Sequence, residues 1–357
     1  MLGHRLFILN IFLLISFTEI VSQDNFRVMF YNVENLFDTI DDPAKDDNDF
    51  LPDGFMKWTP WKYRKKLQDI TRVITAVGGM QSPALVGLCE VENDSVIFDL
   101  VNRSPLMAQG YEYVMTNSPD NRGIDNALLY QRHQFKPLES NEYKIGLNQK
   151  NIKPTRNILH VTGLVLSKDT IDVFVCHFPS RSGGQKETEP ARIESAKALR
   201  NIVDSVLLKR NNANFIIMGD FNDQPSDKSM SEILRANSTD LYNDILQSDS
   251  ESEIEKELFN LFYRKNNNSE IGTYKYQGRW YINDHIIVSG NLLDTNNHIF
   301  VKNRLAHIYK ADFLLEDDHG YYGKKPFRTN LGPRYNAGFS DHLPVYMDLI
   351  INIHSEI

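Results

Sequence analysis

Polar side chains of catalytic type stand at the ends of several apolar segments of this sequence. The segment "IIMGDFND" (216–223) runs from apolar residues into Asp220, Asn222 and Asp223. Five further segments place Asn32 in "MFYNVEN", Glu90 in "VGLCEVEN", His177 in "VFVCHFPS", Asp284 in "YINDHIIV", and the pair Asp341 and His342 in "GFSDHLPV". One such residue alone is more often a turn former. Six segments together indicate a shared site, because the ends of packed strands hold side chains rigidly.

The carboxylate, amide and imidazole groups of this set limit the chemistry that they can perform. Carboxylates and amides without a cysteine cluster favour a hard cation such as Mg²⁺, Mn²⁺ or Ca²⁺. Zinc is the alternative, although the sequence contains no HExxH motif and no closely spaced histidine pair to hold it. Hydrolysis of a phosphate ester fits the set best. A metal would polarise a phosphoryl oxygen, an aspartate would position and deprotonate water, and a histidine oriented by a second aspartate would stabilise the transition state.

Short apolar segments and amphipathic segments predict the elements that must position these groups. Strands are expected where β-branched and aromatic residues gather, over 26–33, 84–91, 111–116, 126–131, 160–166, 171–178, 214–221, 282–289 and 342–351. Helices are expected over 61–77, 191–210 and 227–236. The strands 160–166 and 171–178 are expected to pair in antiparallel fashion. The pattern indicates a mixed sheet architecture that is covered by helices.

Composition and charge are those of an ordinary globular protein. The chain has 357 residues, of which 41% are hydrophobic and 24% charged, and its net charge is −8. Such a charge argues against holding DNA by bulk attraction, although a local basic groove or a metal ion can supply a positive field. Length permits one large domain or two small ones. No break in composition marks a second domain, so a single catalytic domain is expected over 23–357.

The N-terminal segment predicts export from the cytoplasm. An apolar run from Leu6 to Phe17 is too short to span a bilayer and fits a secretory signal peptide over residues 1–22. An uncleaved anchor or a buried helix is the alternative. The prediction is a secreted or periplasmic protein without stable membrane insertion after cleavage. Its two cysteines, Cys89 and Cys176, are expected to be buried free thiols, and a disulfide is possible only if their strands are neighbours.

The order of these motifs resembles that of the endonuclease/exonuclease/phosphatase superfamily, to which pancreatic deoxyribonuclease belongs. The resemblance rests on Asn32, Glu90, His177, "GDFN" (219–222), Asp284 and "SDH" (340–342), and extends from Phe26 to Ile350. It implies the α/β (α+β) fold of that superfamily, a four-layer α-β-β-α sandwich of two mainly antiparallel sheets with helices outside. "FYNVENLFDT" and "PSRSGG" resemble a secreted or periplasmic bacterial branch.

The resemblance also implies a role for each motif residue. Glu90 matches the principal metal ligand, with Asn32 beside it and Asp341 as a carboxylate near the metal. Asp220 matches the residue that positions the attacking water, and Asn222 its partner in orientation. His177 matches the histidine that contacts phosphate, with Asp125 or Asn126 as its candidate partner, and His342 matches a second histidine paired with Asp284. The resemblance leaves open whether Asp220 or His342 is the general base.

Substrate preference is predicted from cations near these motifs. Arg181 and Arg192 flank a glycine-rich loop after His177 and could grip a phosphate, unless they are ordinary surface arginines. The loop 315–339 could stack nucleobases, grip a headgroup or pack on the sheet, because it interleaves Lys324, Lys325, Arg328 and Arg334 with Tyr321, Tyr322, Phe327 and Tyr335. The favoured hypothesis is a monomeric Mg²⁺-dependent endonuclease that acts on nucleic acid. The alternatives are a phosphodiesterase or phosphatase for small-molecule or phospholipid-headgroup phosphates, and a non-catalytic binding module.

Overall fold

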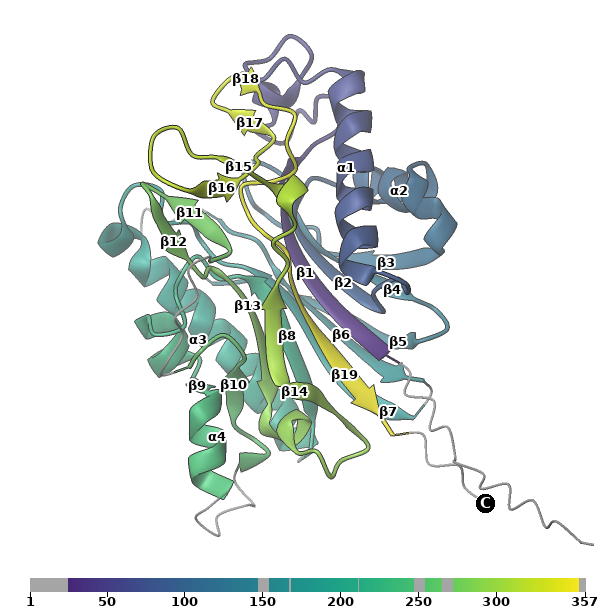
Figure 1. Cartoon of the computed structure of the whole chain (residues 1–357), viewed down its shortest axis with the longest axis vertical. Helices are drawn as coiled ribbons and strands as arrows, with labels where there is room; N and C mark the ends of the chain where they lie inside the picture. The colour runs from purple at the N-terminus through teal and green to yellow at the C-terminus, as the bar shows by residue number, and fades with distance from the viewer. Residues whose placement is uncertain are drawn as a thin grey trace, which may run out of the picture.

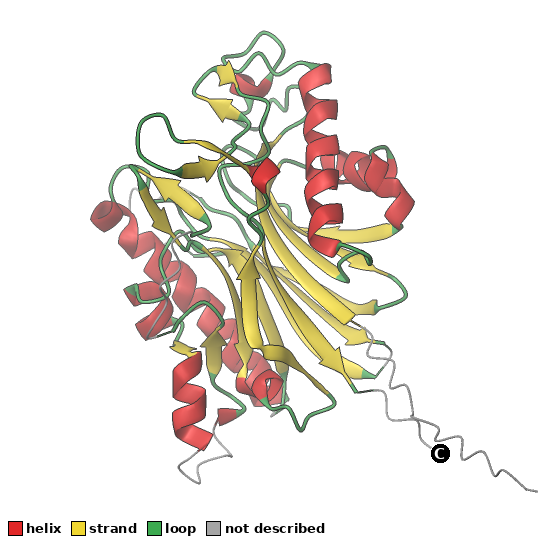
Figure 2. Ribbon diagram, viewed as in Figure 1, coloured by secondary structure: helices red, strands yellow, loops and turns green. Residues whose placement is uncertain are grey.

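Two large β-sheets packed face to face form the centre of the molecule, with helices on both outer faces (Figures 1 and 2). The computed structural model describes residues 25–146, 154–166, 168–210, 212–246, 254–264 and 272–352. The predicted signal peptide, residues 1–22, lies outside the described residues. The helices α1 (Pro60–Gly78) and α2 (Asp94–Asn102) cover one sheet, and α3 (Gln185–Lys209) and α4 (Thr239–Leu246) lie on the side of the other. The predicted four-layer sandwich is therefore confirmed.

The first sheet has six strands in the order β14-β19-β1-β2-β4-β3. Their bounds are β1 Asn25–Leu36, β2 Leu85–Val91, β3 Tyr111–Met115, β4 Asp125–Gln131, β14 Ile299–Ile308 and β19 Val345–Ile351. Only β1 and β2 pair in parallel, and the other neighbours are antiparallel. The parallel pair matters for the site, because the ends of parallel strands meet at the same edge of a sheet.

The second sheet has seven strands in the order β5-β6-β7-β8-β13-β10-β9. Their bounds are β5 Phe135–Tyr143, β6 Ile158–Val165, β7 Asp169–His177, β8 Asn214–Asp220, β9 Ala236–Ser238, β10 Leu258–Asn260 and β13 Asp284–Ser289. The predicted antiparallel pairing of β6 with β7 is confirmed, and β7 runs parallel to β8. Like the first sheet, this sheet has a parallel pair at its centre, but β9 and β10 at its edge also pair in parallel.

Three of the four α-helices have recognisable start signals. Their bounds are α1 Pro60–Gly78, α2 Asp94–Asn102, α3 Gln185–Lys209 and α4 Thr239–Leu246. Thr59 caps α1 directly before a proline, Asn93 caps α2, and Gly184 precedes α3. The prediction of a helix over 227–236 was wrong, because only a short π-helical turn, Ser229–Ile233, forms there. Short 3-10 turns lie at Asn48–Phe50, Pro105–Gln109, Gly290–Leu293 and Asp312–Leu314.

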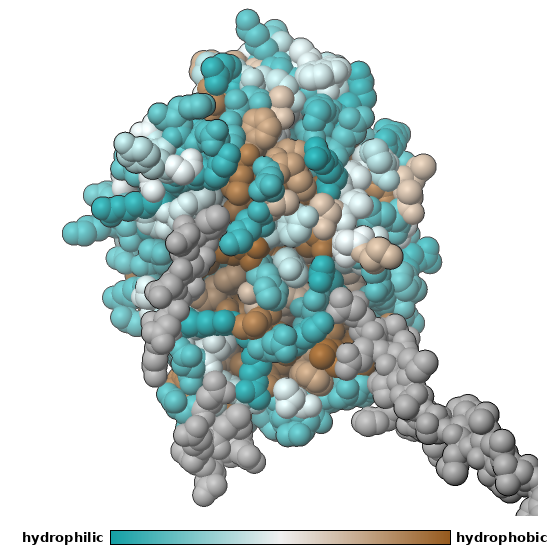
Figure 3. Space-filling model, viewed as in Figure 1, coloured by the Kyte–Doolittle hydropathy of each residue, from teal (hydrophilic) through white to brown (hydrophobic). Residues whose placement is uncertain are grey.

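The hydrophobic core has three layers that follow from this arrangement. One cluster fills the space between the sheets, a second lies between the first sheet and α1 and α2, and a third lies under α3. Figure 3 shows hydrophobic residues along the centre of the visible face and hydrophilic residues around its margins. Cys89 and Cys176 are buried free thiols on different sheets. Within the described residues, no helix has both the length and the apolar content to cross a membrane.

Three small hairpins lie together at one end of the sandwich, uppermost in Figure 1. They pair β11 Tyr274–Tyr276 with β12 Arg279–Tyr281, β15 Leu315–Asp317 with β16 Lys324–Pro326, and β17 Asn330–Leu331 with β18 Arg334–Tyr335. An isolated bridge joins Tyr274 to His342. The first hairpin is thereby tied to the predicted catalytic residues.

Candidate active site

The predicted catalytic side chains meet where the central strands of both sheets end. Glu90 lies near the end of β2, while His177 and Asp220 are the last residues of the parallel strands β7 and β8. The pairing register sets His177 directly beside Asp220, and Asp284 opposite Asp220 in β13. Residues that are far apart in the sequence therefore share one edge of the sandwich.

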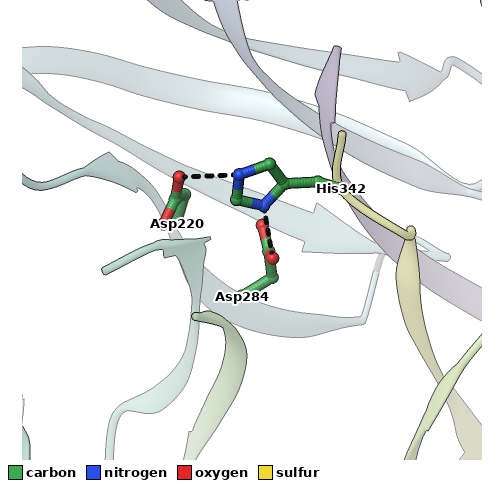
Figure 4. A group of neighbouring side chains, drawn as sticks. All are labelled: Asp220, Asp284 and His342. Carbon is green, nitrogen blue, oxygen red and sulfur yellow. Dashed lines mark hydrogen bonds and ion pairs between the residues drawn. The ribbon is translucent and has the colours of Figure 1, made fainter. Parts of the chain in front are cut away.

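A buried Asp–His–Asp set forms the centre of this site (Figure 4). His342 Nδ1 lies 2.7 Å from Asp284 Oδ2, and His342 Nε2 faces Asp220 Oδ2 at 3.7 Å. All three side chains are at most 6% exposed. The second distance exceeds a hydrogen bond. A ligand oxygen placed between Asp220 and His342 would contact both groups.

Asn32 joins the two sheets at this point. Its side-chain nitrogen donates to Asp220 Oδ2 at 3.0 Å and to Glu90 Oε1 at 3.3 Å. His177 Nε2 lies 3.8 Å from both of these carboxylates. The structure thus brings together Asn32, Glu90, His177, Asp220, Asp284 and His342, which sequence reasoning had placed in one site.

Strained backbone positions Glu90. Both β1 and β2 change register here, and Glu90 adopts a left-handed conformation with φ 61°. Glu34 and Asn35 also have positive φ, and the Asn35 N–H donates to Glu90 Oε2 at 3.0 Å. Non-glycine residues rarely adopt such angles, and those that do concentrate at functional sites. The bulge turns the Glu90 carboxylate towards the site.

Burial and charge give the titratable groups of the site different pKa values. Burial raises the pKa of Asp220 to about 7, although the positive charge of His342 opposes this shift. Burial alone would lower the pKa of His342, but the charges of Asp284 and Asp220 hold it well above its usual value. Burial, together with nearby Arg156, holds the pKa of His177 well below the usual range. At neutral pH, His342 is a cation and His177 is neutral.

A second charged cluster adjoins the site, and sequence reasoning named two of its members, Asp341 as a carboxylate near the metal and Arg328 as one of the cations of the loop 315–339. The Arg328 guanidinium joins Glu34 Oε1 at 3.0 Å to Asp341 Oδ2 at 3.1 Å. Buried Lys66 donates to the Phe339 carbonyl at 2.6 Å, and burial lowers its pKa to about 8. Glu34 lies in the irregular part of β1, where the pairing register shifts and φ is positive, so strand alternation gave no signal for its position. Nothing in the helical pattern of α1 distinguished Lys66 from a surface lysine.

The donor atoms of the site fit a divalent cation that prefers oxygen. Glu90 keeps 15% of its side chain exposed, and its Oε1 contacts Asn32 only at 3.3 Å. Asp284 Oδ1 is buried and has no hydrogen-bond partner in the part of the chain that the structure describes. Asp220 and Asp284 each offer a carboxylate oxygen, and these two oxygens lie within 4.8 Å of one another, whereas cationic His342 beside them has no lone pair for a metal. Burial is the main cause of the raised pKa of Asp220, and the nearby charges of Asp284 and Glu90 raise it further, so a bound cation would stabilise the ionised carboxylate.

Asn222 and Asp223 belong to the loop that follows Asp220, and both are held firmly. The Asn222 N–H donates to Asp220 Oδ1 at 2.9 Å, and its side chain donates to the Phe178 carbonyl. The Asp223 carboxylate pairs with Arg181 at 2.9 Å and with Arg192 at 2.7 Å. These contacts fix the backbone that orients Asp220.

The two arginines predicted to bind substrate therefore have different positions. Arg192 is fully buried against Asp223, so the structure does not place it where it could contact a substrate. Arg181 keeps 20% of its side chain exposed, but it also pairs with Asp227 and donates to the Asn222 carbonyl. Sequence alone could not separate the two, because both flank the same glycine-rich loop.

The predicted partners of His177 lie elsewhere. Asp125 accepts hydrogen bonds from Ser118 and Thr116, and the Asn126 side chain donates to the Asn157 carbonyl. His177 Nδ1 is buried and has no hydrogen-bond partner among the described residues. The hypothesis of an Asp125 or Asn126 partner was wrong.

The fold and this site define a class of phosphate-ester hydrolases. The sequence pattern of the Endonuclease/Exonuclease/phosphatase family matches residues 27–350, so the chain belongs to that family. Members of the family are hydrolases of phosphate esters and generally depend on a divalent metal. Comparison with curated protein sequences gives no match.

Solved structures share the fold at low sequence identity. An endonuclease/exonuclease/phosphatase family protein from Bacteroides thetaiotaomicron is 16% identical with a TM-score of 0.57, and covers 93% of this chain and 100% of its own. A mannosyl-6-phosphatase from the same organism is 17% identical with a TM-score of 0.55, covering 91% and 100%. D. rerio TDP2 complexed with a single-strand DNA product is 16% identical with a TM-score of 0.52, covering 91% and 98%.

Proposed function

We propose that this protein is a divalent-metal-dependent phosphodiesterase, most specifically an extracytoplasmic endonuclease that cleaves nucleic acid. The observation that carries this proposal is the meeting of Asp220 with the Asp284–His342 pair beside Glu90. Glu90 and Asn32 would hold Mg²⁺, or alternatively Mn²⁺ or Ca²⁺, with Asp341 nearby. A bound ion would polarise a phosphoryl oxygen and stabilise the leaving group.

Asp220 is the general base of the proposed reaction. Its pKa of about 7 lies near a physiological pH, where a general base is most effective. Asp220 Oδ takes a proton from water, whose oxygen forms a bond to phosphorus. The bond from phosphorus to the leaving oxygen breaks, and that oxygen departs with the electron pair. Asn222 supports this role because its N–H fixes the second carboxylate oxygen of Asp220.

The two histidines have different tasks because their protonation states differ. Cationic His342, oriented by Asp284, stabilises the negative charge that develops on the phosphoryl oxygens. Its raised pKa argues against His342 as the base. Neutral His177 contributes hydrogen bonding to phosphate without adding a charge. Every acid and histidine that the hydrolysis requires is present, which argues against a non-catalytic binding module.

Hydrolysis of a small phosphate ester is the second candidate function. The mannosyl-6-phosphatase with the same fold acts, by its name, on a sugar phosphate, whereas D. rerio TDP2 binds a single-strand DNA product. Exposed tyrosines beside the site, described below, favour the larger substrate. A signal peptide over residues 1–22, a secreted or periplasmic location and a monomeric state belong to the same proposal.

A panel of substrates tests the proposed function. The purified protein is incubated with supercoiled plasmid, single-stranded DNA, RNA, a chromogenic phosphodiester and mannose 6-phosphate, each with Mg²⁺ and with EDTA. The expected result is metal-dependent cleavage of nucleic acid, with nicking of the plasmid. Hydrolysis of mannose 6-phosphate alone would establish the second candidate, and full activity in EDTA would contradict metal dependence.

A further inference from the structure

The β11–β12 hairpin presents one aromatic and cationic face to the site. Its register pairs Tyr274 with Tyr281 and Tyr276 with Arg279. Paired residues project from the same side of a two-stranded sheet, and residues two apart in a strand do so as well. Tyr274, Tyr276, Arg279 and Tyr281 therefore share a face, which we name the tyrosine wall.

The opposite face of the hairpin is anchored to its neighbour. Lys275 donates to the carbonyls of Tyr322 and Lys324, each at 3.0 Å, and pairs with Asp318 at 2.9 Å. Its side chain is only 3% exposed, and its ammonium group lies 5.8 Å from the Trp280 ring. A lysine so fully engaged holds the β11–β12 and β15–β16 hairpins together, side by side as Figure 1 shows.

The turn of the hairpin fixes its register. Gln277 and Gly278 both have positive φ, 46° and 78°, as a two-residue type I′ turn requires. A Cβ atom at Gly278 would lie 2.8 Å from the Tyr321 ring, so the turn packs closely on that side chain. The tyrosine wall is thus held rigidly before any ligand arrives, which lowers the entropic cost of binding.

The tyrosine wall extends from the catalytic centre to solvent. The Tyr274 ring lies 4.9 Å from the His342 ring, and the Tyr281 ring lies 6.0 Å from the Arg181 guanidinium. Tyr276 is 55% exposed, and among the described residues its hydroxyl has a hydrogen bond only with the neighbouring Gln277, at 3.3 Å. Arg279 is exposed and forms no ion pair with any described residue. An exposed ring and a cation that no described residue pairs thus stand next to the site.

We propose that the tyrosine wall binds the nucleotides next to the scissile phosphate of a single-stranded nucleic acid, with a base stacked on Tyr276 and a phosphate on Arg279. This inference rests on the proposed function. Flat rings stack on tyrosine whatever the base, and a neighbouring cation holds the backbone. The row of Tyr276 and Arg279 lies roughly 7 Å beyond the row of Tyr274, so a small phosphate ester bound at His342 would not reach it.

Kinetics on substrates with and without bases test this assignment. Tyr276→Ala should lower kcat/KM for a single-stranded oligonucleotide roughly 5- to 150-fold, mainly through KM, because each stacked base contributes that much. The same variant should hydrolyse a small chromogenic phosphodiester at the unsubstituted rate. Tyr322→Ala is the matched control, since it removes a tyrosine that is 102% exposed on the neighbouring hairpin and should change neither rate.

Direct binding separates failure of this inference from failure of the proposed function. Anisotropy of a labelled oligothymidylate and of the same backbone without bases is measured in EDTA, where cleavage is absent. Tyr276→Ala should weaken binding of the oligothymidylate, and leave binding of the base-free strand unchanged. Equal weakening of both strands, or no weakening, would overturn the inference even if the protein is a nuclease. If Tyr276→Ala weakens binding of the oligothymidylate alone, but the unsubstituted protein cleaves no nucleic acid with Mg²⁺, the inference stands and the proposed function is refuted.

Discussion

Two buried histidine–aspartate pairs have similar geometry but lie in different parts of the molecule. His342 Nδ1 lies 2.7 Å from Asp284, and His160 Nε2 lies 2.8 Å from Asp172. Asp284 is the first residue of β13, and His342 lies in the segment just before β19. His160 and Asp172 lie within the antiparallel strands β6 and β7, where the register places His160 opposite Phe174. The pair alone does not define an active site.

The two pairs differ in the groups that surround the aspartate and the second histidine nitrogen. Asp172 also accepts hydrogen bonds from Thr162 and from Arg210, and the His160 ring stacks 4.2 Å from the Phe174 ring. His342 instead points its second nitrogen at Asp220, 3.7 Å away and too far for a hydrogen bond. In the first pair the Asp172 carboxylate is fully engaged, and His160 Nδ1 is buried without a hydrogen-bond partner among the described residues, so this pair offers no second carboxylate to a reacting atom and stabilises the fold. The second leaves a position for a reacting atom.

The largest expected effect is on turnover. His342→Ala should lower kcat for phosphodiester hydrolysis by roughly 10²- to 10⁴-fold, as removal of a positioned acid or base usually does. His160→Ala should leave kcat within about twofold, because that pair does not touch substrate. Both variants must keep the near-UV circular dichroism of the folded protein. Equal losses in the two variants would contradict the distinction.

The next largest effect is expected on the affinity for Mg²⁺, which should depend on the candidate active site and not on the His160–Asp172 pair. Glu90→Gln should raise the Mg²⁺ concentration for half-maximal activity roughly 10- to 100-fold, because a ligand carboxylate loses its charge. Asp172→Asn should leave this concentration unchanged, since Asp172 is already neutralised by Arg210 at 2.6 Å. The measurement is a Mg²⁺ titration of the hydrolysis rate. An unchanged requirement in Glu90→Gln would remove Glu90 from the metal site.

Removal of a carboxylate charge should change the free energy of unfolding in opposite directions at Asp172 and at Asp220. Asp172→Asn should lower the free energy of unfolding by about 1–3 kcal/mol, because it weakens buried charged hydrogen bonds. Asp220→Asn in EDTA should raise it by about 1–3 kcal/mol, since burial makes that carboxylate costly to ionise. Urea unfolding at neutral pH measures both changes. A destabilised Asp220→Asn variant would show that this carboxylate serves the fold.

The smallest expected effect is a pH dependence of the structural pair. Burial alone would raise the pKa of Asp172, but hydrogen bonds from His160, Arg210 and Thr162 together lower it below 3.8. A lowered folded-state pKa stabilises the protein above the unfolded value, and this contribution is lost as the pH falls through the folded value. The stability difference between the unsubstituted protein and Asp172→Asn should therefore shrink as the pH drops below about 3.8. A difference that stays constant with pH would contradict this assignment.

The sequence predicted the strands better than the short elements. Alternating or continuous apolar segments marked all nine strands that were expected, including β1, β8 and β13. The strand β5 was missed because "FKPLESNEY" is mostly polar, as an edge strand of one sheet can be. The hairpin β11–β12 was missed because each of its strands has only three residues.

The candidate site could be predicted wherever a polar group ended an apolar strand. Neither Lys66, which reaches from α1, nor Tyr274, which packs on His342, stands at such a position. Arg192 is the reverse case, a residue that the sequence assigned to substrate binding and that the structure buries. Its position next to a glycine-rich loop gives no sign of its burial against Asp223. Contacts between distant segments decide these cases, and a single sequence does not contain them.

The central claim is that carboxylates from two different sheets form one catalytic centre. The most direct test compares kcat/KM for Mg²⁺-dependent phosphodiester hydrolysis in Glu90→Gln, Asp220→Asn and the double variant. Residues that act as a unit are strongly non-additive, so the double variant should be no slower than the slower single variant. Single-variant losses that multiply in the double variant, or a single variant with full activity, would show that Glu90 and Asp220 do not share one reaction.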